Sequence, residues 1–110
     1  MNKDTFDLNR VKAYLERNPE DNVIIISNNK TLSQEYWNRI EGHLGIKKRP
    51  YIVTNSNTWD GFPIMNSLVL KIGRWWENKN AKAFMSQGNL AKLTLPITFI
   101  PPFVKGGEDD

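Results

Sequence analysis

Basic residues and tryptophans are interleaved in one short segment, which is the clearest chemical signal in this sequence. Residues 71–82 contain Lys71, Arg74, Trp75, Trp76, Lys79 and Lys82. Lysine and arginine bind phosphate groups, and an exposed tryptophan beside them suits base stacking or the anchoring of a protein partner. The four basic residues recur at steps of three to five, which on a helix would gather them along one flank. Adjacent helical residues point about 100° apart, so we expect one tryptophan to be exposed, unless both pack between layers of a small domain.

A second basic run precedes a proline and consists of Lys47, Lys48 and Arg49. The net charge is +3, but residues 22–107 hold eleven lysines and arginines against four acids, and residues 108–110 are all acidic. A basic body with an acidic end favours a polyanion-binding surface that the end can occupy when the surface is empty. A solvated surface with no polyanion partner is the alternative interpretation.

Polar runs follow two predicted strands, residues 22–27 and 51–54. If the strands are parallel neighbours, both runs lie at the edge where open α/β sheets bind ligands. The candidate residues for a small anionic ligand are Asn28, Asn29, Lys30, Asn55, Asn57 and Trp59. Asparagine and serine also make turns and helix caps, and that structural role is the alternative.

Several kinds of chemistry lack the residues that they need. The chain has no cysteine and one histidine, His43, so a zinc site of ordinary ligand type cannot be built. No carboxylate pair has acid–base spacing, no glycine-rich phosphate loop follows either strand, and no serine has a base positioned by a motif. We therefore predict a protein that is not an enzyme and needs no cofactor.

The apolar pattern predicts helices over 6–18, 31–44 and 63–76, a short helix over 78–86, and strands over 22–27, 51–54 and 93–100. We place the cap of the 31–44 helix at Thr31 or Ser33 and its end at Gly45. The expected fold is α/β or α+β, a single small three-layer domain with a short, mostly parallel sheet of about three strands and three to four helices. It would span residues 1–105, followed by a disordered acidic tail, 106–110. The predicted core is Val23, Ile24, Ile25, Ile26, Leu32, Ile40, Leu44, Ile52, Val53, Leu68 and Ile72.

No apolar run reaches the roughly 20 residues that span a bilayer, and no secretory signal is visible, so we expect a cytoplasmic protein without a membrane partner. The first functional hypothesis is a small nucleic-acid-binding protein that uses the basic runs and tryptophans named above. The second is a protein-binding inhibitor or adaptor, of the kind that also serves mobile genetic elements, anchored by Trp59, Trp75 and Trp76. A small-ligand binder at the strand ends is the third. Salt dependence separates the first two, because phosphate contacts are strongly screened.

Overall fold

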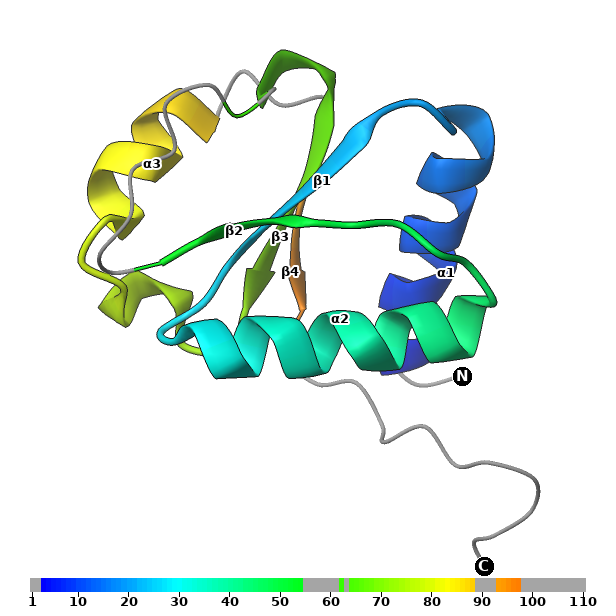
Figure 1. Ribbon diagram of the computed structural model, residues 1–110, viewed down its shortest axis with the longest axis horizontal. Helices are drawn as coiled ribbons and strands as arrows, with labels where there is room; N and C mark the ends of the chain where they lie inside the picture. Colours follow the sequence, from blue (N-terminus) through cyan, green and yellow to red (C-terminus); the bar gives the residue numbers. More distant parts are fainter. Residues whose placement is uncertain (1–2, 55–61, 63, 89–92, 98–110) are drawn as a thin grey trace, which may run out of the picture.

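Four parallel strands form one sheet in the order β2-β1-β3-β4 (Figure 1). The computed structural model describes residues 3–54, 62, 64–88 and 93–97. The strands are β1 (Asn22–Ile26), β2 (Tyr51–Val53), β3 (Ser67–Ile72) and β4 (Leu93–Ile97). Ile25 of β1 is in register with Ile52 on one side and Leu70 on the other, and Leu70 is in register with Leu95. The predicted parallel pairing of β1 and β2 is confirmed.

Helices cover both faces of this sheet, which makes the predicted three layers. Helices α1 (Lys3–Arg17) and α2 (Lys30–Leu44) pack on one face, and α3 (Ala81–Gly88) packs on the other (Figure 1). Short 3₁₀ turns, η1 (Ile64–Asn66) and η2 (Trp75–Glu77), flank β3. Side chains alternate along a strand, so Ile25 of β1 packs in the α1–α2 layer while Ile24 and Ile26 pack in the α3 layer. The mixed α/β fold expected from the sequence is confirmed.

The predicted core is largely confirmed. All four apolar residues of β1, Val23 to Ile26, are fully buried, as expected of a central parallel strand. Among the predicted core residues, only Leu32, Leu44 and Ile52 are partly exposed. Leu32 and Leu44 lie near the two ends of α2, and Ile52 belongs to β2, a strand at the edge of the described sheet.

The start of α2 differs from the prediction. Its N-cap is Asn29, whose side-chain oxygen accepts the Leu32 N–H at 2.7 Å, so neither Thr31 nor Ser33 caps it. Ser33 is fully buried within the helix. The predicted end is confirmed, because Gly45 adopts φ +68°, a left-handed conformation that glycine enters without steric cost.

The predicted helix over 63–76 is wrong, because its central part is strand β3. Leu68, Val69 and Leu70 are fully buried and pack alternately into the two layers. A strand covered on both faces is a continuous apolar run, and such a run also satisfies a helical period over a few residues. Gly73 ends the strand with φ +54°. It lies beyond the last residue of β3, not inside a helix as predicted.

The remaining predicted elements agree with the structure. Helix α3 corresponds to the short helix predicted over 78–86, shifted by two to three residues, and β4 lies within the predicted 93–100 strand. The domain boundary at residue 105 and the acidic tail, 106–110, lie outside the described residues. No helix in the described part of the chain is both long and apolar enough to cross a membrane.

A hydrogen bond between two side chains supports the junction between α1 and β1. The Tyr14 hydroxyl donates to Asp21 Oδ2 at 2.7 Å. Burial, together with the hydrogen bond and charge of Asp21, raises the pKa of Tyr14 above its ordinary value. The hydroxyl therefore stays protonated and able to donate at neutral pH.

Candidate functional site

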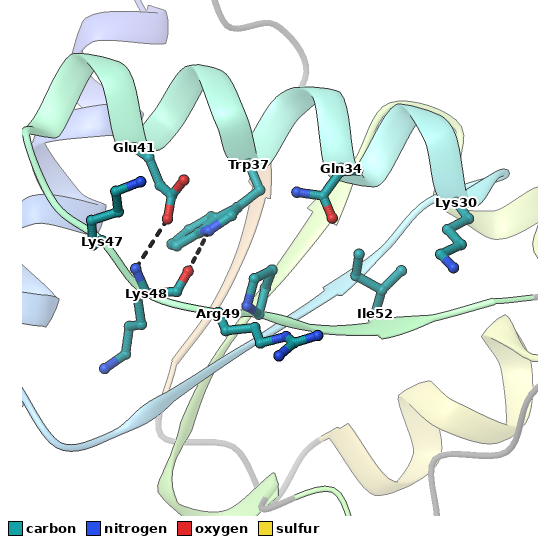
Figure 2. Close-up of a pocket in the computed structure, with 9 residues that line it drawn as sticks. Lys30, Gln34, Trp37, Glu41, Lys47, Lys48, Arg49 and Ile52 are labelled. Atoms are coloured by element: carbon teal, nitrogen blue, oxygen red, sulfur yellow. Dashed lines mark hydrogen bonds between the residues drawn. The ribbon is translucent and has the colours of Figure 1, made fainter.

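A groove of 680 Å³ runs between α2 and the segment that enters β2 (Figure 2). Its lining residues are Lys30, Gln34, Trp37, Glu41, Lys47, Lys48, Arg49, Pro50 and Ile52. We call it the basic groove. Lys30 lies at one end and Lys47 at the other, so the groove follows the length of α2 from its first turn to its last third (Figure 2).

The two sides of the basic groove are joined by a pair of hydrogen bonds at its base. Trp37 is only 1% exposed, and its indole N–H donates to the Lys48 carbonyl at 2.7 Å. The Lys48 backbone N–H in turn donates to Glu41 Oε2 at 3.0 Å. Both side chains come from α2 and both partners are backbone groups of one residue, so they hold the strand-entering segment at a set distance from the helix.

The charge of the basic groove comes from three side chains. Lys30, Lys47 and Arg49 are exposed, and no carboxylate in the described residues forms an ion pair with any of them. The Lys48 ammonium leaves the groove and donates to the Pro19 carbonyl at 3.1 Å. Glu41 is the one acid in the lining, and one of its oxygens already accepts a backbone N–H. The groove is therefore a concave surface with excess positive charge, which favours an anionic ligand.

Polar side chains meet at the carboxyl ends of β1 and β2, where the sequence predicted a ligand site. Ser27 and Ser33 are buried with their hydroxyl oxygens 2.6 Å apart, and Asn29 caps α2. The Asn28 amide donates to Glu77 Oε1 at 3.4 Å. These contacts are the capping and turn roles that were the structural alternative, and Lys30 alone of the described candidates there faces a cavity.

Asn78 ties this edge together, and the sequence did not single it out. It is 4% exposed, and its amide donates to the Ser27 carbonyl at 2.9 Å and to the Val53 carbonyl at 3.1 Å. Its side-chain oxygen accepts the Asn80 N–H, and the Asn80 amide donates to the Thr54 carbonyl at 2.7 Å. The partners lie 25 to 51 residues away in sequence, so no local pattern could identify them.

The tryptophan pair lies beside this edge, in what we call the tryptophan turn, residues 74–77. Trp76 is 60% exposed, whereas Trp75 is half-buried and packs against the core beneath α3. Their rings meet edge to face with centroids 5.9 Å apart. The Lys71 ammonium lies 5.0 Å from the Trp75 ring centre, a cation–π contact. The prediction that one tryptophan is exposed is confirmed.

The predicted basic flank of a helix is wrong. Lys71 belongs to β3, Arg74 precedes η2, Lys79 lies in a turn, and Lys82 belongs to α3. Arg74 also pairs with Glu77 at 2.7 Å, although its side chain remains 69% exposed. These basic residues therefore share no helix surface, and of the four, Arg74 lies in the same turn as the exposed Trp76 ring.

The basic groove and the tryptophan turn approach each other at the carboxyl edge of the sheet. Lys30 closes one end of the groove, and Asn28, two residues earlier, contacts Glu77, the neighbour of Trp76. Lys47, Lys48 and Arg49 lie toward the far end. The structure thus places Lys30 in the same groove as Lys47 and Arg49, and places Asn28 beside the tryptophan turn.

Some sequence-based expectations lie outside this geometry. Asn55, Asn57 and Trp59 fall outside the described residues. Within the described ranges, no three histidine or acidic side chains are grouped so that they could hold a metal ion.

The fold and the groove define a class only: a small α/β protein with a parallel four-stranded sheet and a basic groove at its β2 edge. Comparison with known proteins finds no matching family model and no significantly similar curated protein or solved structure.

Proposed function

We propose that this protein binds single-stranded nucleic acid, without catalysis, along the basic groove and the tryptophan turn. The observation that carries the proposal is the gathering of Lys30, Lys47 and Arg49 around one concave surface with no ion-pair partner in the described residues. Phosphates bound there would displace counterions, which drives most non-specific nucleic-acid binding.

Trp76 supports a single strand as the ligand. A groove of positive charge that follows the backbone, combined with an exposed aromatic ring for the bases, is the common design of single-strand binders. A strand leaving the groove at Lys30 would reach the carboxyl edge, where Trp76 is exposed. Trp37 cannot stack on a base, because its ring is buried and its N–H is already used.

The shape of the basic groove argues against a duplex. Its positive side chains border a hollow between a helix and a strand, and a double helix carries its phosphates on a broad convex surface. Proteins that read duplex DNA usually insert a protruding helix or ribbon into its major groove. Here α2 forms one wall of the groove and lies against the sheet.

Salt-dependent titration of a labelled single-stranded oligonucleotide tests the proposal. We expect neutralisation of two groove cations, Lys47→Gln with Arg49→Gln, to weaken binding and to lower the salt slope by about 1.4, at about 0.7 per lost phosphate contact. The matched control is Lys12→Gln with Arg17→Gln, which removes the same charge from exposed positions on α1 that do not line the groove. Equal losses in the two variants, or no binding by the natural sequence at low salt, would reject the proposal.

A protein partner is the second candidate function, and the exposure of Trp76 is the observation that favours it. Large aromatic side chains are common anchors of protein interfaces. Such an interface would depend weakly on salt and strongly on Trp76, and it would leave Lys47 and Arg49 without effect. We propose a cytoplasmic location for the protein under either function.

A further inference from the structure

The two walls of the basic groove differ in the chemistry of their side chains. Lys47 and Arg49 belong to the segment that enters β2, and Lys30 lies at the end of the groove (Figure 2). Between these cations, the wall formed by α2 presents the amide of Gln34 and the carboxylate of Glu41. The groove therefore has one cationic side and one side that carries hydrogen-bonding groups.

Glu41 has a carboxylate oxygen that the fold does not use. Its Oε2 accepts the Lys48 backbone N–H at 3.0 Å, which holds the side chain at the base of the groove. Its Oε1 forms no hydrogen bond or ion pair with any residue in the described part of the chain. An ionised carboxylate accepts hydrogen bonds and donates none, and it repels phosphate. The Oε1 atom therefore suits a hydrogen-bond donor of the ligand.

Gln34 also directs an acceptor into the groove. Its amide nitrogen donates to Asn38 Oδ1 at 3.0 Å, and this contact sets which way the amide is turned. Figure 2 shows the Gln34 oxygen on the side that faces Ile52. Gln34 and Glu41 are seven residues apart on α2, about 10 Å along its axis. Two different bases of one bound strand can therefore meet the two acceptors.

We propose that a single strand lies in the basic groove with its phosphates on the cations and its base edges on α2, and that Glu41, assisted by Gln34, selects bases that carry an exocyclic amino group. The inference rests on the proposed function and names the sequence preference of the same site. Phosphate contacts position a strand without reading it, whereas contacts to base edges read its sequence. A glutamate accepts from the N4 amino group of cytosine. Uracil has a carbonyl oxygen at that position, which a carboxylate repels.

Cytosine and uracil provide the matched comparison. Oligomers of deoxycytidine and of deoxyuridine, equal in length, have the same sugar and the same phosphates, so electrostatic binding contributes equally to both. Fluorescence anisotropy at one salt concentration measures the two affinities. We expect the natural sequence to bind the deoxycytidine oligomer about fivefold more tightly, the effect of one modest base-specific contact.

Glu41→Gln is the variant that separates base reading from structure. The Lys48 N–H needs an acceptor, so the amide oxygen keeps that bond and the amide nitrogen takes the place of Oε1. An acceptor becomes a donor, and the preference should reverse in favour of deoxyuridine, whose O4 accepts. The matched control is Glu16→Gln, which removes the same charge from an exposed position on α1 and should keep the preference for deoxycytidine. The ratio of the two affinities is the readout, because loss of a negative charge tightens binding of both oligomers.

Gln34→Ala gives an independent variant, because Gln34 is exposed and its loss leaves the Glu41 contact in place. It should reduce the preference for deoxycytidine about twofold. Equal binding of the two oligomers by the natural sequence, or a preference that Glu41→Gln leaves unchanged, would overturn the inference while single-strand binding itself stood. No binding of either oligomer at low salt would reject the proposed function and base selection with it.

Discussion

Trp37 and Trp76 each lie close to basic residues, yet they occupy opposite environments. Trp37 is 1% exposed at the base of the basic groove, and its N–H donates to the Lys48 carbonyl at 2.7 Å. Trp76 is 60% exposed in the tryptophan turn, next to Arg74. The difference comes from the element that carries each residue. Trp37 is in the middle of a long helix that lies on the sheet, whereas Trp76 is in a single 3₁₀ turn that follows strand β3.

This contrast separates two contributions to a binding surface. The buried tryptophan shapes the groove, because it spaces the strand-entering segment from α2 and leaves the cations on the rim. The exposed tryptophan offers a ring to a ligand but supports little of the fold. A tryptophan near basic residues therefore indicates a stacking site only where its ring is exposed to solvent.

Truncation of the two tryptophans provides the largest expected effect. Trp37→Ala should lower the free energy of unfolding by about 3–5 kcal/mol, because it leaves a large cavity beneath α2. Trp76→Ala should change it by less than about 0.5 kcal/mol, as for most surface substitutions. Urea unfolding followed by circular dichroism measures both. Similar losses for the two variants would contradict the assigned environments.

The second largest loss of stability should come from substituting the asparagines that hold the carboxyl edge of the sheet. Asn78→Ala leaves the Ser27 and Val53 carbonyls without their amide donor, and each buried unsatisfied group costs about 1–3 kcal/mol. Asn80→Ala removes a less buried contact and should cost less. The same unfolding experiment compares them. A larger loss for Asn80→Ala would show that the edge is held differently.

For the affinity for single-stranded nucleic acid we expect the opposite order: substitution of Trp76 should have the larger effect and substitution of Trp37 the smaller. Trp76→Ala should weaken binding by about 1–3 kcal/mol and leave the salt slope unchanged, because stacking involves no phosphate. Trp37→Phe keeps a buried ring beneath the groove but loses the N–H that donates to the Lys48 carbonyl, so it should weaken binding, though less than Trp76→Ala does, because Trp37 stacks on no base. Fluorescence anisotropy across a salt series measures both quantities. A change of slope in Trp76→Ala would mean that the ring positions phosphate contacts instead of stacking.

Substitution of Glu77 should have the smallest effect on stability and binding. Glu77→Gln removes the partner charge of Arg74 but keeps the oxygen that accepts from the Asn28 amide. The exposed ion pair contributes about 0–1 kcal/mol, so stability should change little. The salt slope should become steeper by about 0.7, because Arg74 is released to bind one more phosphate. An unchanged slope in the same titration would place Arg74 outside the interface.

Local patterns in this sequence predicted much of the fold. The β-branched run of β1, the apolar stripe of α2 and the left-handed Gly45 after it are signals contained within a few residues of each other. The segment 63–76 was misassigned for a physical reason. Once Leu68, Val69, Leu70 and Ile72 are all apolar, periodicity no longer tells a strand covered on both sides from a buried helix.

The candidate site could be predicted only in part. Lys47, Lys48 and Arg49 were recognised from composition, and one of the two adjacent tryptophans was expected to be exposed. The ammonium of Lys48 nevertheless turns to the Pro19 carbonyl, 29 residues away in sequence, and leaves the groove. At the strand ends, where a ligand site was expected, Asn29 and Asn78 satisfy backbone groups, and the contact of Asn78 is not visible in any local sequence pattern.

By itself, the sequence determined the class of fold, the buried central strand, the excess of positive charge and the lack of cysteine chemistry. These properties depend on composition and on patterns of two to four residues. The tertiary structure alone decided that Lys30 joins Lys47 and Arg49 around one groove, that Trp37 is buried while Trp76 is exposed, and that Asn78 ties two strands together. Each of these facts is a contact between residues distant in the chain, set by which strands pair and which helix covers them.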